Sequence, residues 1–235
     1  AAALHNAGLR RVTVSLDSLK ASRFETLTRR AALDDVIAGI ETAAAVGFES
    51  LKINTVVMRD FNDDELVDMI EFGRRFGAEV RFIEYMDVGG ATLWNRERVV
   101  SRHDILEKLT AHYGSVDEVG SRGHAPAERF QLPAGDRFGI ISSTTQPFCR
   151  DCDRSRLTAD GFWFLCLYAR DGISLRERLR DGASADELSQ AIGGIWRRRA
   201  DRGAEERAEL VERGALYQIE ELRQDPRREM HTRGG

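Results

Sequence analysis

Three segments near the start of the chain alternate between apolar and polar residues, which is the pattern of strands with one buried face. They cover residues 11–16, 51–58 and 80–86, and the first two are rich in β-branched residues. Because successive side chains of a strand point to opposite sides, each segment predicts one apolar face and one polar face.

Segments with helical periodicity separate these strands. One is predicted over residues 33–46 and ends at Gly47. The next begins near Asn62 and Glu65, an N-cap residue and its partner three positions later, and ends near Gly77. Strand and helix in alternation, with about thirty to forty residues between strand starts, are typical of parallel βαβ units. The pattern therefore predicts an α/β fold for this half.

The polar faces of the strands share a chemical character. Ser15 lies on the polar face of the first strand, Lys52 and Asn54 on that of the second, and Arg81 on that of the third. Burial of a lysine or arginine without a charged partner costs free energy, so the pattern favours a barrel whose polar lumen holds a ligand. The alternative is that each residue lies near a strand end in water.

The pattern changes beyond residue 87. A glycine-containing loop, a short helix, a hairpin around PAGD and two further helices are predicted, the last opened by Ser184 and Glu187. The arginine-rich run at residues 195–203 fits an anion site or, more commonly, a solvated helix face. We place a domain boundary near residue 110, between residues 1–110 and residues 111–235.

Composition narrows the function classes. The 235 residues, 42% hydrophobic and 31% charged, suit one large or two small globular domains. A net charge of −4 argues against non-specific nucleic-acid binding. The sequence contains neither a run of about 18 apolar residues nor a signal-peptide pattern at its start, so we expect no membrane association and a cytoplasmic location.

All three cysteines lie between residues 147 and 166, spaced C-x2-C-x13-C. Cys149, Cys152 and Cys166 cannot all pair with one another, so metal binding or catalysis is the better interpretation. A structural zinc site needs a fourth ligand such as His112 or His124, whereas an iron–sulfur cluster with an open iron does not. Three unliganded core cysteines remain a third possibility.

Two arginines follow the second cysteine, in the segment DRSRLT. The guanidinium forks of Arg154 and Arg156 suit phosphate groups and purine edges. An open iron beside them suits a phosphorylated substrate whose ring nitrogen can occupy the vacant iron position.

Four segments together resemble one family: FCRDCDRSRLTADGFWFLCL, VSLDSL, LKINTVVM and VRFIEYMDVG. They are similar, in order and approximate spacing, to the GTP 3',8-cyclases of molybdenum cofactor biosynthesis, which are radical S-adenosylmethionine (radical SAM) enzymes. The resemblance covers essentially the whole chain. It implies part of an incomplete TIM-like parallel barrel, followed by a C-terminal α+β iron–sulfur region.

The resemblance also implies roles for individual residues. Cys149, Cys152 and Cys166 would hold an auxiliary 4Fe-4S cluster whose open iron faces the guanine of GTP. The residues that match GTP-contacting positions are Lys52, Arg81, Arg154, Ser155 and Arg156. Ser15 and Met86 match positions around S-adenosylmethionine. Gly234 and Gly235 match a double-glycine tail that enters the active site, the alternative being a frayed terminus.

The family's initiating chemistry uses another 4Fe-4S cluster, bound by a CxxxCxxC motif that this sequence lacks. We therefore expect a truncated form of a longer enzyme, able to hold the auxiliary cluster but not to cleave S-adenosylmethionine, and we assign no catalytic residue. The family converts GTP to (8S)-3',8-cyclo-7,8-dihydroguanosine 5'-triphosphate, which passes to cyclic pyranopterin monophosphate synthase. A homodimer is compatible with the sequence.

Two other classes of function are compatible with these patterns. A zinc-stabilised module that binds nucleotides or RNA would need a fourth zinc ligand and a basic face with exposed aromatics. Another radical SAM enzyme with an auxiliary cluster, such as a peptide-modifying one, commonly has more than three cysteines in its C-terminal extension. Metal analysis separates the zinc module from the enzymes.

Overall fold

The computed structural model describes residues 1–233, which form two compact units. The first, called the sheet unit, comprises Ala1–Tyr85 and Glu97–Gln146. The second, called the cysteine unit, comprises Met86–Arg96 and the described chain from Pro147 onward. The functional division into residues 1–110 and 111–235 remains a prediction. No described helix is both long and apolar enough to cross a membrane.

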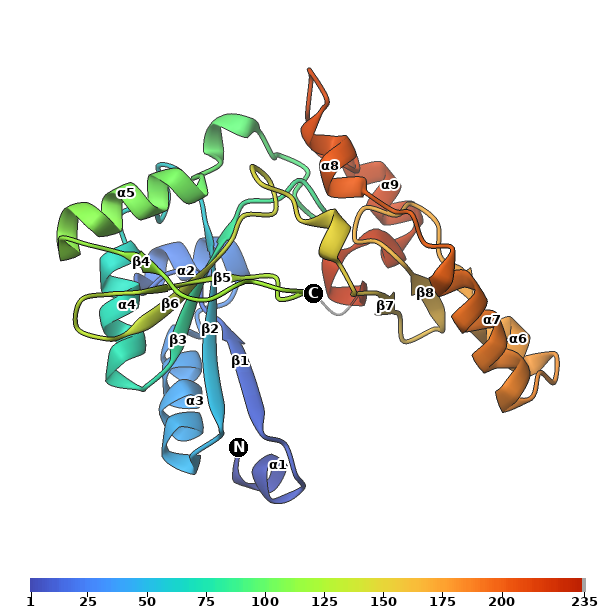
Figure 1. The fold of residues 1–235 in the computed structure, drawn as a ribbon, viewed down its shortest axis with the longest axis horizontal. Coiled ribbons are helices and arrows are strands. Elements are labelled where there is room, and N and C mark those ends of the chain that lie inside the picture. The colour runs from blue at the N-terminus through green and yellow to red at the C-terminus, as the bar shows by residue number, and fades with distance from the viewer. Residues whose placement is uncertain (234–235) are drawn as a thin grey trace. The chain divides into compact units, whose positions relative to one another are not determined.

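A six-stranded sheet with the order β1-β2-β3-β6-β5-β4 forms the centre of the sheet unit (Figure 1). Its strands are β1 (Arg11–Ser15), β2 (Ser50–Val57), β3 (Glu79–Glu84), β4 (Asp117–Glu118), β5 (Glu128–Gln131) and β6 (Arg137–Ile141). The pairs β1-β2, β2-β3 and β3-β6 are parallel. The pairs β4-β5 and β5-β6 are antiparallel. The predicted α/β class and the hairpin around PAGD are confirmed.

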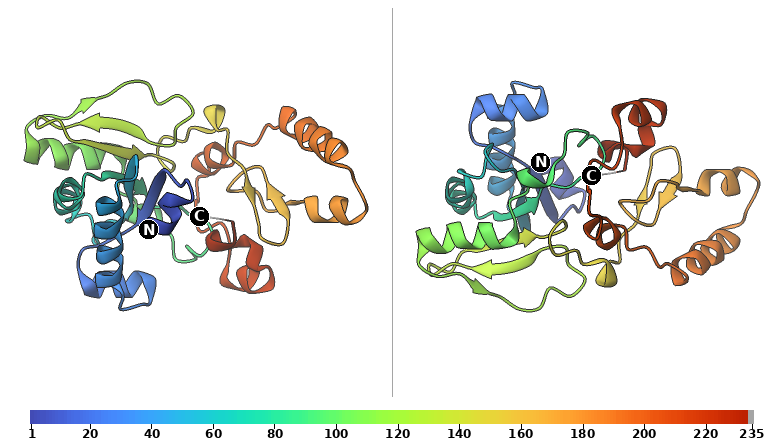
Figure 2. Two further views of the ribbon diagram at one scale, coloured as in Figure 1. Left: turned by 90° about the horizontal axis from the view of Figure 1, so that it is seen from below. Right: turned by 90° about the horizontal axis from the view of Figure 1, so that it is seen from above.

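Helices cover one face of this sheet (Figure 2). They are α2 (Ala21–Thr28), α3 (Leu33–Val46), α4 (Leu66–Arg75) and α5 (Arg102–Tyr113); the short α1 (Ala2–Asn6) has no buried residue, and a 3-10 turn lies at Arg96–Arg98. Alternate residues of β2 and β3 are buried in the core that α2 to α5 share with the sheet. The opposite face is half-buried, so the predicted division into an apolar and a polar face is present.

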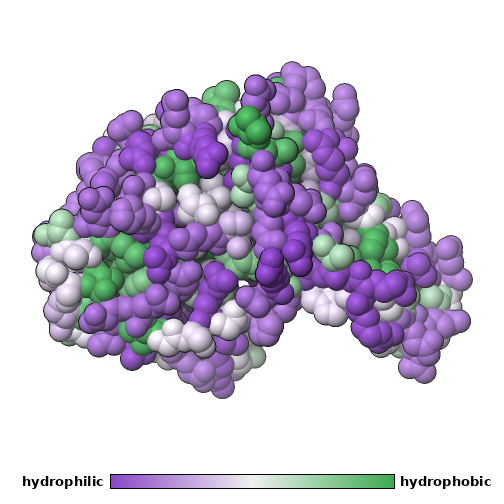
Figure 3. Space-filling view, turned by 45° about the horizontal axis from the view of Figure 1, so that its top comes forward, coloured by the Kyte–Doolittle hydropathy of each residue, from purple (hydrophilic) through white to green (hydrophobic). Residues whose placement is uncertain are grey.

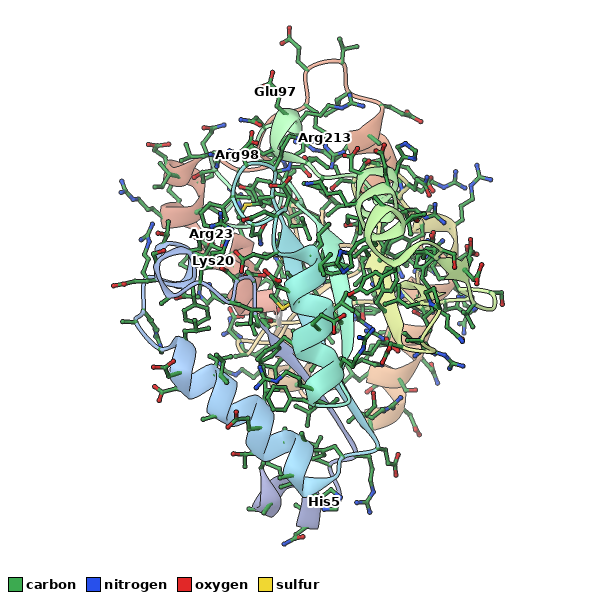
Figure 4. All side chains as sticks on the ribbon, turned by 90° about the vertical axis from the view of Figure 1, so that its left-hand side faces the viewer. His5, Lys20, Arg23, Glu97, Arg98 and Arg213 are labelled. Carbon is green, nitrogen blue, oxygen red and sulfur yellow. The ribbon has the colours of Figure 1, made fainter. Side chains whose placement is uncertain are left out.

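The start of α4 differs from the predicted capping box. Glu65 is the residue before the helix, and its buried carboxylate accepts hydrogen bonds from the Ser18 hydroxyl (2.8 Å) and the Arg23 guanidinium (2.6 Å). Asn62 donates instead to the backbone carbonyl of Asp17 (2.7 Å). Lys20 and Arg23, at the start of α2, lie near each other in Figure 4. Asn62 and Glu65 therefore make hydrogen bonds to residues distant in the sequence instead of forming the predicted helix cap.

The cysteine unit is built on a three-stranded antiparallel sheet with the order β7-β8-β9. Its elements are β7 (Arg156–Leu157), β8 (Phe162–Phe164), β9 (Ile173–Ser174), α6 (Leu175–Arg180), α7 (Ala185–Arg197), α8 (Gly203–Ala208), α9 (Ile219–Gln224) and 3-10 turns at Cys149–Asp151, Pro226–Arg228 and Met230–Arg233. The predicted capping box of Ser184 and Glu187 is present at the start of α7. That helix ends at Arg197, so the arginine-rich run continues beyond it.

The large exposed apolar side chains are scattered along the chain, from Leu4 to Ile219. On the face drawn in Figure 3, hydrophilic side chains predominate and the hydrophobic groups are small and separate. The outward positions of the edge strand β1 are also polar, with Arg11, Thr13 and Ser15 exposed. Scattered apolar groups of this kind are normal for a protein surface.

Asp87 is the ionic centre of the cysteine unit. Its fully buried carboxylate accepts hydrogen bonds from Arg213 (2.8 Å), Arg207 (2.8 Å) and the Tyr168 hydroxyl (3.0 Å). Burial alone would raise the pKa of Asp87, but the two guanidinium groups outweigh it and hold the pKa below its ordinary value of 3.8. The loop after β3 is thereby tied to the C-terminal helices.

Replacement Asp87→Asn should destabilise the cysteine unit by about 3 kcal/mol at pH 7, because Arg213, with only 4% of its side chain exposed, would lose its buried anion. The stabilising effect of a carboxylate with a lowered pKa is complete above pH 3.8 and is lost as the pH falls below it. The difference in the free energy of unfolding between wild type and variant should therefore become smaller below pH 4.

Urea unfolding followed by tryptophan fluorescence measures this effect selectively, because all three tryptophans lie in the cysteine unit. Asp171→Asn, at an exposed position, is the matched control. Equal losses of stability in the two variants would contradict the role of Asp87.

Candidate functional site

The register of the parallel strands places predicted ligand residues in one row. Ser15 of β1 pairs with Asn54 of β2, and Asn54 pairs with Arg81 of β3. Lys52 lies two residues before Asn54 on the same face. Gly139 of β6 pairs with Arg81 in the same row, and a Cβ atom there would lie 3.3 Å from the Cγ atom of Arg81. A glycine at this position thus leaves room for the arginine.

Arg81 and Lys52, the two cations of this face that the sequence predicted, have different partners. The Nε atom of Arg81 lies 3.0 Å from a carboxylate oxygen of Glu79. Lys52 makes no hydrogen bond or ion pair with any described residue. Its pKa is lowered, first by burial and then by the charge of Arg81. An anion placed here would favour the charged form of Lys52 and so offset both effects, which suits this face to a negatively charged ligand.

Three buried oxygen atoms of the sheet unit have no hydrogen-bond partner among the described residues: Asn54 Oδ1, Ser142 Oγ and Ser143 Oγ. Buried polar atoms are normally paired, so each is a candidate contact for a ligand or water. Asn54 lies on the polar face that the sequence predicted, but neither the pattern nor the family resemblance assigns it a role. The two serines were missed because nothing in the sequence predicts that β6 pairs with β3.

The loop that contains these serines is fixed by Glu84 at the end of β3. Its fully buried carboxylate accepts hydrogen bonds from the backbone N–H groups of Thr144 (2.9 Å) and Thr145 (2.8 Å). It also accepts a hydrogen bond from the Thr145 hydroxyl (2.6 Å) and from the backbone N–H of Arg102 (2.9 Å). The carboxylate thus orders the segment that follows β6.

The three cysteines of the cysteine unit are free and half-buried. Burial raises the pKa of Cys149, although backbone N–H groups of Glu205 and Ala204 partly oppose it. Burial also acts on Cys152, but its pKa is lowered overall by the backbone N–H of Arg154 and the guanidinium groups of Arg199 and Arg154. The Cys152 sulfur therefore lies in surroundings that favour the thiolate.

A single zinc ion and an iron–sulfur cluster place different demands on the spacing of three thiolates. Among the described residues, no three His, Cys, Asp or Glu side chains converge on one ion position, with or without His112 and His124. A tetrahedral zinc site holds its sulfurs roughly 3.8 Å apart, given zinc–sulfur bonds of about 2.3 Å. A cluster attaches each thiolate to a different iron and so spaces the sulfurs more widely. Three soft donors with cationic neighbours suit such a cluster.

The predicted arginines follow directly in the chain. Arg154 lies over the ring of Phe148 at 4.9 Å, and its Nη2 atom is 3.6 Å from the Cys152 sulfur. Arg156 begins β7, and its pKa is lowered by burial and by the charge of Arg154. The Nε atoms of both arginines are buried without a described partner. Ser155 lies between them, so the segment presents cations with unused donors.

Arg233 is a further candidate that the sequence did not indicate. Its side chain is buried, and its guanidinium lies 4.0 Å from the ring centroid of Phe164. It donates hydrogen bonds to the carbonyl oxygens of Leu167 and Ala169, both at 3.0 Å, while its Nη2 atom has no described partner. Arginine side chains are mostly exposed to solvent, so nothing in the sequence pattern indicated that Arg233 is buried.

The predicted site residues thus fall into two groups. Ser15, Lys52 and Arg81 share a face of the sheet unit, whereas the three cysteines, Arg154, Ser155 and Arg156 lie together in the cysteine unit. Met86 belongs to the cysteine unit, where it packs against that unit's core. Gly234 and Gly235 lie outside the described residues.

Comparison with known proteins adds named relatives. The chain is 55% identical to "GTP 3',8-cyclase 1" of Mycobacterium tuberculosis over 232 residues, which are 99% of this chain and 65% of the relative. It is 52% identical to "GTP 3',8-cyclase 3" of Mycobacterium bovis, over 99% of this chain and 61% of the relative. It is 44% identical to "GTP 3',8-cyclase" of Acidothermus cellulolyticus, over 87% of this chain and 58% of the relative. The chain thus spans less than two thirds of the length of these relatives.

Two family models match the chain. Residues 1–73 match the radical SAM superfamily, in agreement with the mostly parallel sheet. Residues 78–205, which include all three cysteines and both arginines of the RSR segment, match the model described as Molybdenum Cofactor Synthesis C. Since that match covers more than half of the sequence, the chain belongs to the Molybdenum Cofactor Synthesis C family.

Proposed function

We propose that this chain is the larger part of a GTP 3',8-cyclase that acts in molybdenum cofactor biosynthesis. The observation that carries the proposal is the arrangement in the cysteine unit, where three half-buried free thiols lie with arginines whose buried Nε atoms have no described partner. The names of the relatives and both family matches support it.

In this proposal, Cys149, Cys152 and Cys166 are the protein ligands of an auxiliary 4Fe-4S cluster. Bound there, the cluster supplies a Lewis-acidic iron with an open position for a ring nitrogen of guanine. The chain's own contribution is to hold three thiolates half-buried and to place guanidinium groups beside them. Cationic neighbours stabilise thiolate charge in such a site.

GTP is the proposed substrate. Arg154, Ser155 and Arg156 would bind it beside the cluster, and Lys52 and Arg81 would bind its phosphates at the polar face of the sheet. Unused donors on the arginines and the unpaired ammonium group of Lys52 supply what a triphosphate requires. Ring closure needs the ribose and the base of the nucleotide to be held in a fixed geometry, and positioning by such contacts is what the protein would supply.

S-adenosylmethionine is proposed as the second small molecule, and it supplies the radical that starts the family's reaction. Ser15 and Met86 are the residues we assign to it. The unpaired Oδ1 atom of Asn54, one strand from Ser15 in the same row, extends this polar surface. The sequence has no CxxxCxxC motif, so the cysteines for an initiating cluster are not within it.

The remaining assignments extend this proposal. The cyclised product would pass to cyclic pyranopterin monophosphate synthase, the protein would act in the cytoplasm, and a homodimer is compatible with it. Residues 1–110 would supply the barrel part and residues 111–235 the cluster-binding part.

Anaerobic reconstitution of the chain with iron and sulfide should give about four irons per chain, because three thiolates suffice to anchor a cluster with one open iron. Iron and acid-labile sulfide analysis is the measurement. The variant Cys149→Ala should lose most of this iron. One zinc per chain without sulfide would favour the zinc-stabilised module instead.

Arg154→Ala and Arg156→Ala should each weaken GTP binding by about 1.5–3 kcal/mol, the range for a hydrogen bond to a charged group. Calorimetric titration of the reconstituted chain measures the change. The exposed Arg178→Ala is the matched control for charge. Unchanged affinity in both test variants would remove the substrate role of the RSR segment.

Lys52 should react with an amine-acylating reagent at a lower pH than Lys20 or Lys108, the chain's other two lysines. A lowered pKa leaves more neutral amine at a given pH, whereas the other two are paired with Asp64 and Asp63. Peptide mass spectrometry after brief labelling at several pH values measures the order.

Two additions sharpen this test. Arg81→Gln should slow acylation of Lys52, because it removes a neighbouring positive charge, while the exposed Arg137→Gln should not. GTP should protect Lys52. Equal acylation rates at all three lysines would show that the pKa of Lys52 is not lowered.

A further inference from the structure

Three consecutive arginines mark the end of α7, and only one of them is turned inward. Arg197 and Arg198 are exposed, whereas 10% of the Arg199 side chain is accessible. The sequence favoured a solvated helix face for this run, and that interpretation fails at Arg199 because α7 ends at Arg197. The change in backbone direction turns its side chain toward the cysteine segment.

Arg199 contacts Cys152 through two separate atoms. Its Nη1 atom donates a hydrogen bond of 2.9 Å to the Cys152 carbonyl oxygen, and its Nη2 atom lies 3.6 Å from the Cys152 sulfur. A planar guanidinium can make both contacts at once, which fixes the backbone and the thiol together. A lysine ammonium cannot match this two-point geometry.

Aromatic packing holds the guanidinium in place. It lies over the ring of Trp196 at 4.8 Å, and Trp196 stacks on Trp163 of β8 with ring centroids 6.2 Å apart. Asp201 lies 3.7 Å from the Arg199 Nε atom and is partly exposed. The arginine is therefore preorganised, and its nearest carboxylate is too distant and too exposed to neutralise it.

The chain beyond Arg199 reaches the other two cysteines. Backbone N–H groups of Ala204 and Glu205 are directed at the Cys149 sulfur. A Cβ atom on Gly203 would lie 3.1 Å from the Cys166 sulfur and 2.5 Å from the Cβ atom of Tyr168. One segment, residues 199–205, thus contacts all three sulfurs, and its Arg199 supplies a positive charge beside Cys152.

We propose that Arg199 is a positioning residue that orients Cys152 and stabilises the charge on its sulfur when a cluster is bound. This inference rests on the proposed cluster at the three cysteines. Arg154 also reaches the Cys152 sulfur, but it belongs to the segment assigned to substrate. Arg199 would keep a cation at this sulfur while Arg154 turns to a nucleotide.

A cation beside a cluster thiolate favours the reduced state, which carries one more negative charge. Loss of the charge should therefore lower the reduction potential of the cluster. Loss of the two-point contact should also speed the release of iron, because the ligand is no longer held in place. These two effects separate the proposed role from a purely structural one.

The test uses the whole 235-residue chain, reconstituted anaerobically with iron and sulfide, in four forms: wild type, Arg199→Gln, Arg199→Lys and Arg198→Gln. Arg198→Gln removes the same charge from the neighbouring exposed position. The measurements are iron and sulfide content, the midpoint potential followed by electron paramagnetic resonance, and the rate of iron loss to a chelator.

Arg199→Gln should shift the one-electron reduction equilibrium about tenfold, or about 59 mV, toward the oxidised cluster. It should lose iron about tenfold faster than wild type. Arg199→Lys should retain most of the potential but lose iron faster, because it keeps the charge without the two-point contact. Arg198→Gln should match wild type in both measurements.

Several results would overturn the inference. Potentials of Arg199→Gln and Arg198→Gln that agree, with equal rates of iron loss, would show that Arg199 has no special role. If Arg199→Gln does not retain a cluster, Arg199→Lys is the deciding variant, and a wild-type rate of iron loss from it would reject the positioning of Cys152 by the two-point contact. A wild-type chain that binds no cluster would reject the proposed cluster itself, and the inference with it.

Discussion

The parallel register of β1, β2 and β3 is the constraint on which the candidate site of the sheet unit depends. It sets Ser15, Asn54 and Arg81 in one row and leaves Lys52 on the same face, while the alternate residues pack beneath the helices. A slip of one residue in β2 would bury Lys52 in an apolar core, at a cost that no described partner could offset. The hydrophobic face therefore determines where the polar groups lie.

Both the polar face of the sheet unit and the cysteine unit contain positively charged side chains with polar atoms that have no described partner. The Asp87 carboxylate pairs with both Arg207 and Arg213, and that ion cluster serves stability. Arg154, Arg156 and Arg233 instead keep buried nitrogen atoms without described partners. A folded chain tolerates such atoms where a ligand or sulfur anion can complete them, so unused donors distinguish a candidate binding site from a structural ion pair.

Local patterns were sufficient for much of the fold. Alternation in β2 and β3, the capping box of Ser184 and Glu187, and the hairpin around PAGD all lie within short stretches of sequence. The parallel pairing of β6 with β3, which brings Ser142 into the sheet unit, joins segments far apart in the chain and left no local signal. Asn62 and Glu65 formed long-range bonds in place of the predicted cap for the same reason.

The ionic centre at Asp87 has a consequence for how the chain would survive cleavage. Arg207 and Arg213 flank a short surface excursion whose tip includes Leu210 and the almost fully exposed Val211. Exposed tips of this kind are where proteases cut most readily. Arg207 and Arg213 both bind the carboxylate of Asp87. A cut at Val211 would therefore leave the two new chain ends close together, and the C-terminal fragment would stay bound noncovalently.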